Sequence, residues 1–167
     1  MLTRDLVALY EYSMLMHERE WCVTRLPGEL GVKRIDREVE PLLLGVAVQG
    51  YGRRAIGVNE LILGTPLEIP VIAHECAHLL LGHAIGYCAP GSLETRQEHD
   101  AWVGAALLSV PCHDAEFDNR WLMHACRVPR ELLALRHDLF HVGSTDGAYQ
   151  HLRRWLIAMT DGLLKWK

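Results

Sequence analysis

Apolar residues recur every three or four positions over several stretches of the chain, which is the spacing of an amphipathic helix. This pattern predicts helices over residues 3–18, 71–84, 93–110, 118–128, 129–140 and 146–164. Pro70 suits the first turn of the second helix, Ser92 is expected to cap the third, and Pro111 ends it.

Two short runs of β-prone residues lie between the first and second predicted helices. They cover residues 43–48 and 55–58 and are separated by a segment with Gly50 and Gly52, so they predict a hairpin. No internal repeat is visible. We therefore expect a mainly helical α+β fold with a small antiparallel sheet, in a single domain over residues 1–167. Its catalytic core would cover about 1–112 and a helical C-terminal subregion about 113–167.

Composition narrows the class of protein. The 167 residues are 50% apolar, carry a formal net charge of −4 and contain no long run of like charges, so we expect no nucleic-acid or membrane surface. No stretch approaches the roughly 18 to 20 apolar residues of a membrane span, and the N-terminal residues do not resemble an export signal. The five cysteines show no CxxC spacing, which favours reduced thiols and a cytoplasmic location.

The segment HECAH, residues 74–78, carries the candidate chemistry. His74 and His78 are four residues apart, so on a helix both imidazoles project from one face and can bind one metal ion. Glu75 is placed beside that ion as a general base that accepts a proton from water. Two imidazoles, a carboxylate and an open position are typical of hydrolytic zinc, so Zn²⁺ is the expected cofactor.

The bland alternative is that these three residues are hydrogen-bonded polar groups of the core. The residues around them are apolar, and they predict a buried helix: Val71, Ile72, Ala73, Ala77, Leu79, Leu80 and Leu81. Burying two histidines and a glutamate there costs several kcal/mol unless they are paired or bind a metal. The metal site is the preferred interpretation.

A catalytic zinc site needs a third protein ligand. His83 lies about 140° round a continued helix from His78, so we expect it to point elsewhere. The metzincin pattern HExxHxxGxxH fails, because Leu81 and Ala84 occupy its glycine and last histidine. The ligand must come from another element.

The helix predicted over residues 93–110 offers that ligand. Glu98 shares a face with Ala101 and Ala105, whose small side chains permit another helix to approach closely. Asp100 lies about 200° away from Glu98 round the helix. Glu98 is therefore the expected third ligand, and Asp100 is kept as the alternative.

Three segments together resemble the ImmA/IrrE family of metallopeptidases: residues 56–83 with Ala-His-Glu at the start of the motif helix, residues 94–111 ending in proline, and residues 125–136. The resemblance implies a small zincin-like, gluzincin-like fold in which Glu98 is the third zinc ligand. It also implies a substrate, a helix-turn-helix transcriptional repressor of phage, mobile-element or stress genes. Trp102 and Val110 depart from the family pattern.

The leading hypothesis is a zinc-dependent endopeptidase that cleaves one cytoplasmic protein. The alternative is a zinc-containing binding module that sequesters or displaces a repressor without cutting it. A purely structural metal site would need four protein ligands. The oligomeric state stays open.

Other residues have the right chemistry but no assigned role. An oxyanion donor could be any of Tyr51, Tyr87, His113, His124, His137 and His141. Asp100 or Asp114 could orient the ligand histidines. Cys76 is expected to be a small core residue, and residues 55–59 are expected to be an edge strand that pairs with an extended peptide.

Overall fold

The computed structural model describes residues 4–17, 22–38, 43–83, 85–89, 95–110 and 120–165. The α-helices in this part of the chain are α1 (Arg4–His17), α2 (Leu26–Glu29), α3 (Glu68–Leu80), α4 (Arg96–Ser109), α5 (Arg120–Cys126), α6 (Arg130–His141) and α7 (Asp146–Leu164). The strands are β1 (Lys33–Arg37), β2 (Gly45–Gly50), β3 (Arg53–Asn59) and β4 (Ile85–Cys88). Short 3₁₀ turns cover Val23–Arg25 and Glu60–Ile62. The predicted α+β class is confirmed.

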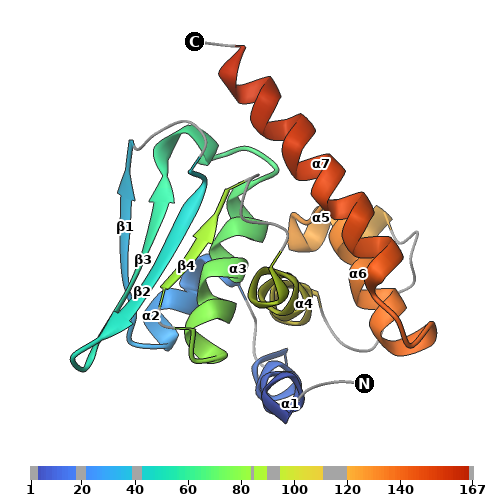
Figure 1. Ribbon diagram of the computed structural model, residues 1–167, viewed down its shortest axis with the longest axis horizontal. Helices are drawn as coiled ribbons and strands as arrows, with labels where there is room; N and C mark the ends of the chain where they lie inside the picture. The colour runs from blue at the N-terminus through green and yellow to red at the C-terminus, as the bar shows by residue number, and fades with distance from the viewer. Residues whose placement is uncertain are drawn as a thin grey trace.

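The four strands form one sheet in the order β1-β3-β2-β4 (Figure 1). The predicted hairpin is present as β2 and β3, but β1 pairs with β3 in parallel, so the sheet is mixed and not purely antiparallel. β1 and β4 gave no sequence signal. β1 has the sequence KRIDR, in which Ile35 is the only apolar residue, and β4 spans four residues, too few for a visible alternation.

β3 lies inside the sheet, because β1 pairs with one of its sides and β2 with the other. The expectation that residues 55–59 form an edge strand for a bound peptide is therefore wrong. Both hydrogen-bonding sides of that segment are already used by the protein itself. Among the strands the structure describes, the edges of the sheet are β1 and β4.

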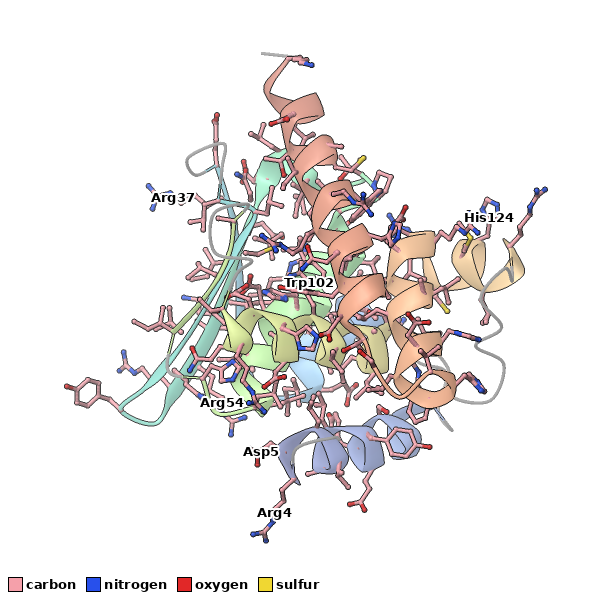
Figure 2. The ribbon with its side chains drawn as sticks, turned by 45° about the vertical axis from the view of Figure 1, so that its right-hand side comes forward. Arg4, Asp5, Arg37, Arg54, Trp102 and His124 are labelled. Carbon is pink, nitrogen blue, oxygen red and sulfur yellow. The ribbon has the colours of Figure 1, made fainter. Side chains whose placement is uncertain are left out.

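Helix α3 packs across one face of the sheet, and α4 packs against the other side of α3 (Figure 1). α1 and α6 contact α4, and α7 lies against α6. In Figure 2 the charged residues Arg4, Asp5 and Arg37 lie on the outside of the molecule, whereas Trp102 of α4 lies near its middle. Trp102 is fully buried. Within the described residues, no helix has the length and apolar character needed to cross a membrane.

The boundaries of the two central helices differ from the sequence prediction. α3 begins at Glu68 and not after Pro70. Pro70 fits in the first turn of the helix, because backbone N–H groups there have no partner within the helix and the N–H that proline lacks is not needed. It ends at Leu80, before the predicted 84. α4 begins at Arg96, because the extended residue Thr95 is its N-cap and accepts a hydrogen bond from the Glu98 N–H at 3.2 Å. The expected cap, Ser92, lies outside the described residues.

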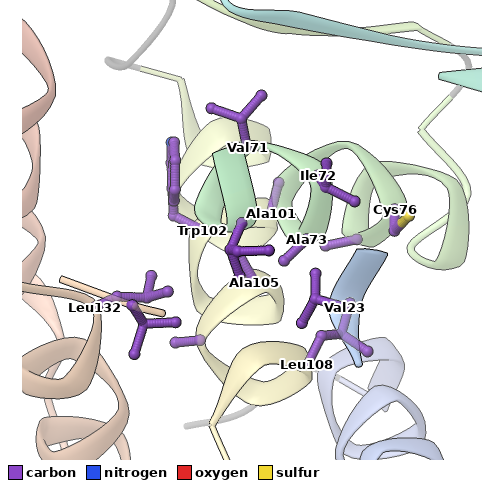
Figure 3. Packing of buried hydrophobic residues seen from close by; sticks show 14 of the residues in the cluster. Val23, Val71, Ile72, Ala73, Cys76, Ala101, Trp102, Ala105, Leu108 and Leu132 are labelled. Carbon is purple, nitrogen blue, oxygen red and sulfur yellow. The ribbon is translucent and has the colours of Figure 1, made fainter. Parts of the chain in front are cut away.

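Small side chains let α3 and α4 approach each other closely. Ala73 of α3 and Ala101 and Ala105 of α4 are fully buried in this region of the core (Figure 3). A Cβ atom added at Gly104 would lie 2.8 Å from Ala77 Cβ and 2.7 Å from Leu9 Cδ2. Gly104 therefore sets how near α4 can come to α3 and to α1.

This close approach predicts opposite effects for the same substitution at two helical glycines. Gly104→Ala should lower the free energy of unfolding by about 1–3 kcal/mol, because the new methyl group meets the immobile Cβ of Ala77. Gly162→Ala in α7 should raise it by up to about 1 kcal/mol, because nothing lies within 4 Å of that position and alanine favours the helix. Urea unfolding of both variants measures the difference. Equal effects at the two positions would contradict the packing described for α3 and α4.

Candidate metal centre

His74 and Glu75 come from the middle of α3 and His78 from its last turn, where the helix is covered by the sheet on one side and by α4 on the other. Their exposed fractions are 0%, 0% and 1%. The apolar residues around them bury this part of the helix, as the sequence predicted. The three polar side chains are consequently shielded from bulk water.

Glu98 reaches the same place from the first turn of α4. Its Oε2 lies 3.1 Å from His74 Nε2 and its Oε1 lies 3.2 Å from His78 Nε2. The two Nε2 atoms lie 3.0 Å apart. The structure therefore brings together the three side chains predicted as metal ligands, and each directs a ligand atom at a common point.

These separations fit a bound metal ion. Ligand atoms at roughly 2.0–2.1 Å from a tetrahedral ion lie about 3.3 Å from one another, close to the spacings seen here. The buried cluster of His74, His78 and Glu98 can thus hold a metal ion. Two imidazole nitrogens and one carboxylate also leave a coordination position for water or a substrate.

The electrostatics of the cluster keep two of the ligands in their binding forms. Burial lowers the pKa of His74 to about 4, although hydrogen bonding to Glu98 acts in the opposite direction. Burial raises the pKa of Glu98, but interactions with His74 and His78 outweigh it and lower the pKa to about 2. At neutral pH, His74 is therefore neutral and Glu98 is ionised, which are the states that bind a cation.

Glu75 lies beside the cluster, and its carboxylate accepts no hydrogen bond from the described residues. Burial and the charge of Glu98 raise the pKa of Glu75 well above its usual value. The N–H of Cys88 offsets part of this increase but lies outside hydrogen-bonding geometry. A cation held by the neighbouring ligands would favour the ionised form of Glu75.

Glycine at position 45 makes room for the Glu75 side chain beneath the sheet. A Cβ atom added at Gly45 of β2 would lie 2.7 Å from Glu75 Oε1 and 2.7 Å from Val71 Cγ1. Gly45 is buried and pairs with Cys88 of β4, so the strand passes directly over this part of α3. The carboxylate is held between the helix and the backbone of the sheet.

Cys88 is a residue near the site that the sequence did not single out. Its Sγ forms a second close group with His74 and Glu75, in which all ligand atoms lie within 4.8 Å of one another. Burial, together with the nearby carboxylates, raises the pKa of this thiol well above its usual value, so it is protonated at neutral pH. A protonated thiol is a poor metal ligand. Cys76 is a buried core residue, as predicted.

Two other predictions concerned Asp100 and His83. Asp100, the alternative third ligand, lies away from the cluster, 3.7 Å from Arg96 Nε and 3.4 Å from His99 Nδ1. His83 does not point elsewhere, and that expectation is wrong. Because α3 ends at Leu80, His83 folds back and its Nδ1 lies 2.7 Å from His78 Nδ1.

Trp102 packs against the other ligand histidine. Its ring lies 4.2 Å from the His74 ring, centroid to centroid, with an angle of 30° between the planes. Trp102 follows Glu98 by four residues on α4, so both face α3 from neighbouring turns. This helix therefore supplies both the third ligand and the surface that supports the first.

The described candidates for an oxyanion donor lie outside the cluster. Tyr51 is fully exposed at the tip of the β2–β3 hairpin, and His124 lies on the outer side of the molecule, away from Trp102 (Figure 2). His137 and His141 pack against each other on α6. The side chain of Tyr87 and the residues His113 and Asp114 lie outside what the structure describes.

Comparison of this chain with protein-family models, with curated proteins and with solved structures gives no significant match. The resemblance to the ImmA/IrrE metallopeptidases therefore stays a prediction from the sequence motifs. What can be said about the site depends on the geometry of its own residues.

The geometry predicts that a divalent metal stabilises the folded chain through Glu98. Zn²⁺ at about 100 times its dissociation constant should add about 2.7 kcal/mol to the free energy of unfolding, because the three ligands converge only in the folded state. Glu98→Ala should remove most of this increase, whereas Asp100→Ala should keep it. Thermal melting with Zn²⁺ and with a chelator gives the comparison. Equal loss of stabilisation in the two variants would contradict the assignment of Glu98.

Proposed function

We propose that this chain is a zinc-dependent peptidase whose ligands are His74, His78 and Glu98 and whose general base is Glu75. The observation that carries the proposal is that the Nε2 atoms of His74 and His78 lie 3.0 Å apart and each lies within 3.2 Å of one Glu98 oxygen, beside a buried carboxylate without a hydrogen-bond partner in the described structure. A purely structural metal site does not need a buried carboxylate such as Glu75 beside its ligands.

The ligand set supports zinc as the ion. Two imidazoles and one carboxylate leave zinc an open position, and a bound zinc ion polarises a carbonyl group and lowers the pKa of water to about 7. His74 and Glu98 hold the correct charge states for this at neutral pH. Cys88 forms a close group with His74 and Glu75 and does not belong to the group of His74, His78 and Glu98.

Glu75 is positioned to move the proton in such a reaction. Its two oxygens have no hydrogen-bond partner among the described residues, so they can accept a proton from water as the water attacks a peptide carbonyl. Glu75 can then give this proton to the amine that leaves. Burial raises the pKa of this carboxyl group, which makes it a stronger base than an exposed glutamate once a cation at the neighbouring ligands favours its ionised form.

The edge of β4 is the segment we propose as the binding surface for the peptide. β4 pairs with β2 on one side, and no other described strand pairs with it. A Cβ atom added at Gly86 would lie 2.3 Å from His78 Cγ, so the backbone of this strand runs directly against a metal ligand. An extended peptide that pairs with β4 would pass beside the metal centre.

The resemblance to the ImmA/IrrE metallopeptidases extends the proposal to the substrate. We propose that the chain cuts one protein, a cytoplasmic helix-turn-helix repressor, and has little activity on general substrates. The low exposure of the proposed metal centre is in line with a restricted choice of substrate, since none of the three ligand residues is more than 5% exposed.

The decisive variant is Glu75→Gln, which keeps the size of the side chain and removes the base. It should bind Zn²⁺ as the unaltered chain does but cut at least about 100-fold more slowly, because general-base catalysis contributes 10²–10⁴-fold. The assay incubates each protein with the helix-turn-helix repressor encoded nearest to its gene and detects fragments by mass spectrometry. Glu60→Gln, at an exposed glutamate after β3, is the matched control and should cut normally.

Equal cutting by the Glu75→Gln variant and the unaltered chain would show that the proposed mechanism is wrong. Loss of repressor function in strict proportion to added protein, with no fragment and with zinc bound, would favour the non-proteolytic binding module instead.

A further inference from the structure

After α3 ends, the chain turns back so that His83 contacts His78, one of the proposed metal ligands. Gly82 has a φ of +77°, the left-handed conformation that glycine adopts easily. The N–H of His83 donates to the carbonyl of His78 at 2.9 Å, and the N–H of Gly82 donates to the carbonyl of Leu79 at 3.3 Å. These bonds define a Schellman motif, in which the residue after the glycine lies over the residue five positions earlier.

That position usually holds an apolar contact, but here it holds two histidines. His78 and His83 lie with Nδ1 atoms 2.7 Å apart and ring centroids 5.0 Å apart. A hydrogen bond between two nitrogens needs one donor and one acceptor. His78 must keep Nε2 free of a proton to bind a metal, so its proton lies on Nδ1, which donates to Nδ1 of His83.

Contacts from the sheet hold this arrangement in place. Gln49 of β2 donates from Nε2 to the carbonyl of His83 at 2.9 Å, which fixes the turn against the sheet. Gly86 of β4 lies against the ring of His78, where an added Cβ atom would lie only 2.4 Å from its Cδ2. His83 itself is only half-buried.

The two ligand histidines are therefore oriented in different ways. Nδ1 of His74 has no hydrogen-bond partner in the described part of the chain, and its ring is supported by the stacked ring of Trp102. His78 has a specific acceptor for its Nδ1 proton. We propose that His83 is a positioning residue that fixes the tautomer and orientation of His78 for metal binding. This inference rests on the proposed function, because it assumes that His78 is a ligand.

Two substitutions separate hydrogen bonding from packing. His83→Leu removes the acceptor and should weaken Zn²⁺ binding by about 10–100-fold, the usual effect of losing a partner of a metal-bound histidine. His83→Asn places an amide oxygen where Nδ1 was and should recover most of that loss. His141→Leu, at an exposed histidine at the end of α6, is the control and should bind Zn²⁺ normally.

The measurements are Zn²⁺ affinity by competition with a chelator and the protonation of His78 Nδ1 by ¹H–¹⁵N NMR. In the zinc-loaded chain and in His83→Asn, the Nδ1 proton should be visible and slow to exchange; in His83→Leu it should exchange faster. Affinity of His83→Leu within about threefold of the unaltered chain would overturn the inference. An equal loss in His83→Asn would also overturn it, because the acceptor would then not matter. If His83→Leu fails to fold, His83→Asn still tests the inference, because the signal of the His78 Nδ1 proton should remain visible and slow to exchange in that variant.

Failure of the proposed function gives a different result. If the unaltered chain does not bind Zn²⁺, the metal site itself is wrong. If it binds Zn²⁺ tightly and His83→Leu does too, only the role of His83 is wrong.

Discussion

The close contact between α3 and α4 brings together the three residues that could hold a metal ion. His74 and His78 are fixed relative to each other by one turn of α3, but Glu98 reaches them only because alanines and Gly104 let α4 approach. The first turn of α4 is set in turn by Thr95, whose side chain caps the helix and leaves Glu98 free to face α3. One packing interface thus sets both the core of the fold and the geometry of the site.

The same interface creates an electrostatic problem that a cation would relieve. It buries the Glu98 carboxylate and two imidazoles, while the sheet covers the Glu75 carboxylate, and such groups are costly without partners. Burial keeps His74 neutral and the two histidines keep Glu98 ionised, but Glu75 has no hydrogen-bond partner among the described residues and its pKa is raised. A divalent ion at the three ligands would lower the cost of the nearby Glu75 charge. The burial that stabilises the core therefore also raises the pKa of Glu75, the proposed base.

Sequence patterns predicted the parts of the molecule that follow local rules. The spacing of His74 and His78, the buried character of α3 and the alanine face that carries Glu98 all follow from helix geometry. The failures came from helix ends and from pairing between distant strands. The cap at Thr95 was missed because Ser92 was expected to cap the helix, and the Gly82 turn that brings His83 onto His78 was missed because the helix was predicted to continue to residue 84. The position of β3 inside the sheet depends on β1, a strand that is mostly polar and far away in sequence.

The most direct test of the account is X-ray absorption spectroscopy of the zinc-loaded chain at neutral pH. The account predicts a shell of nitrogen and oxygen atoms at roughly 2.0–2.2 Å, with two imidazoles and no sulfur. A sulfur ligand at about 2.3 Å would contradict it, because it would place the thiolate of Cys88 on the metal, and so would a spectrum without histidine.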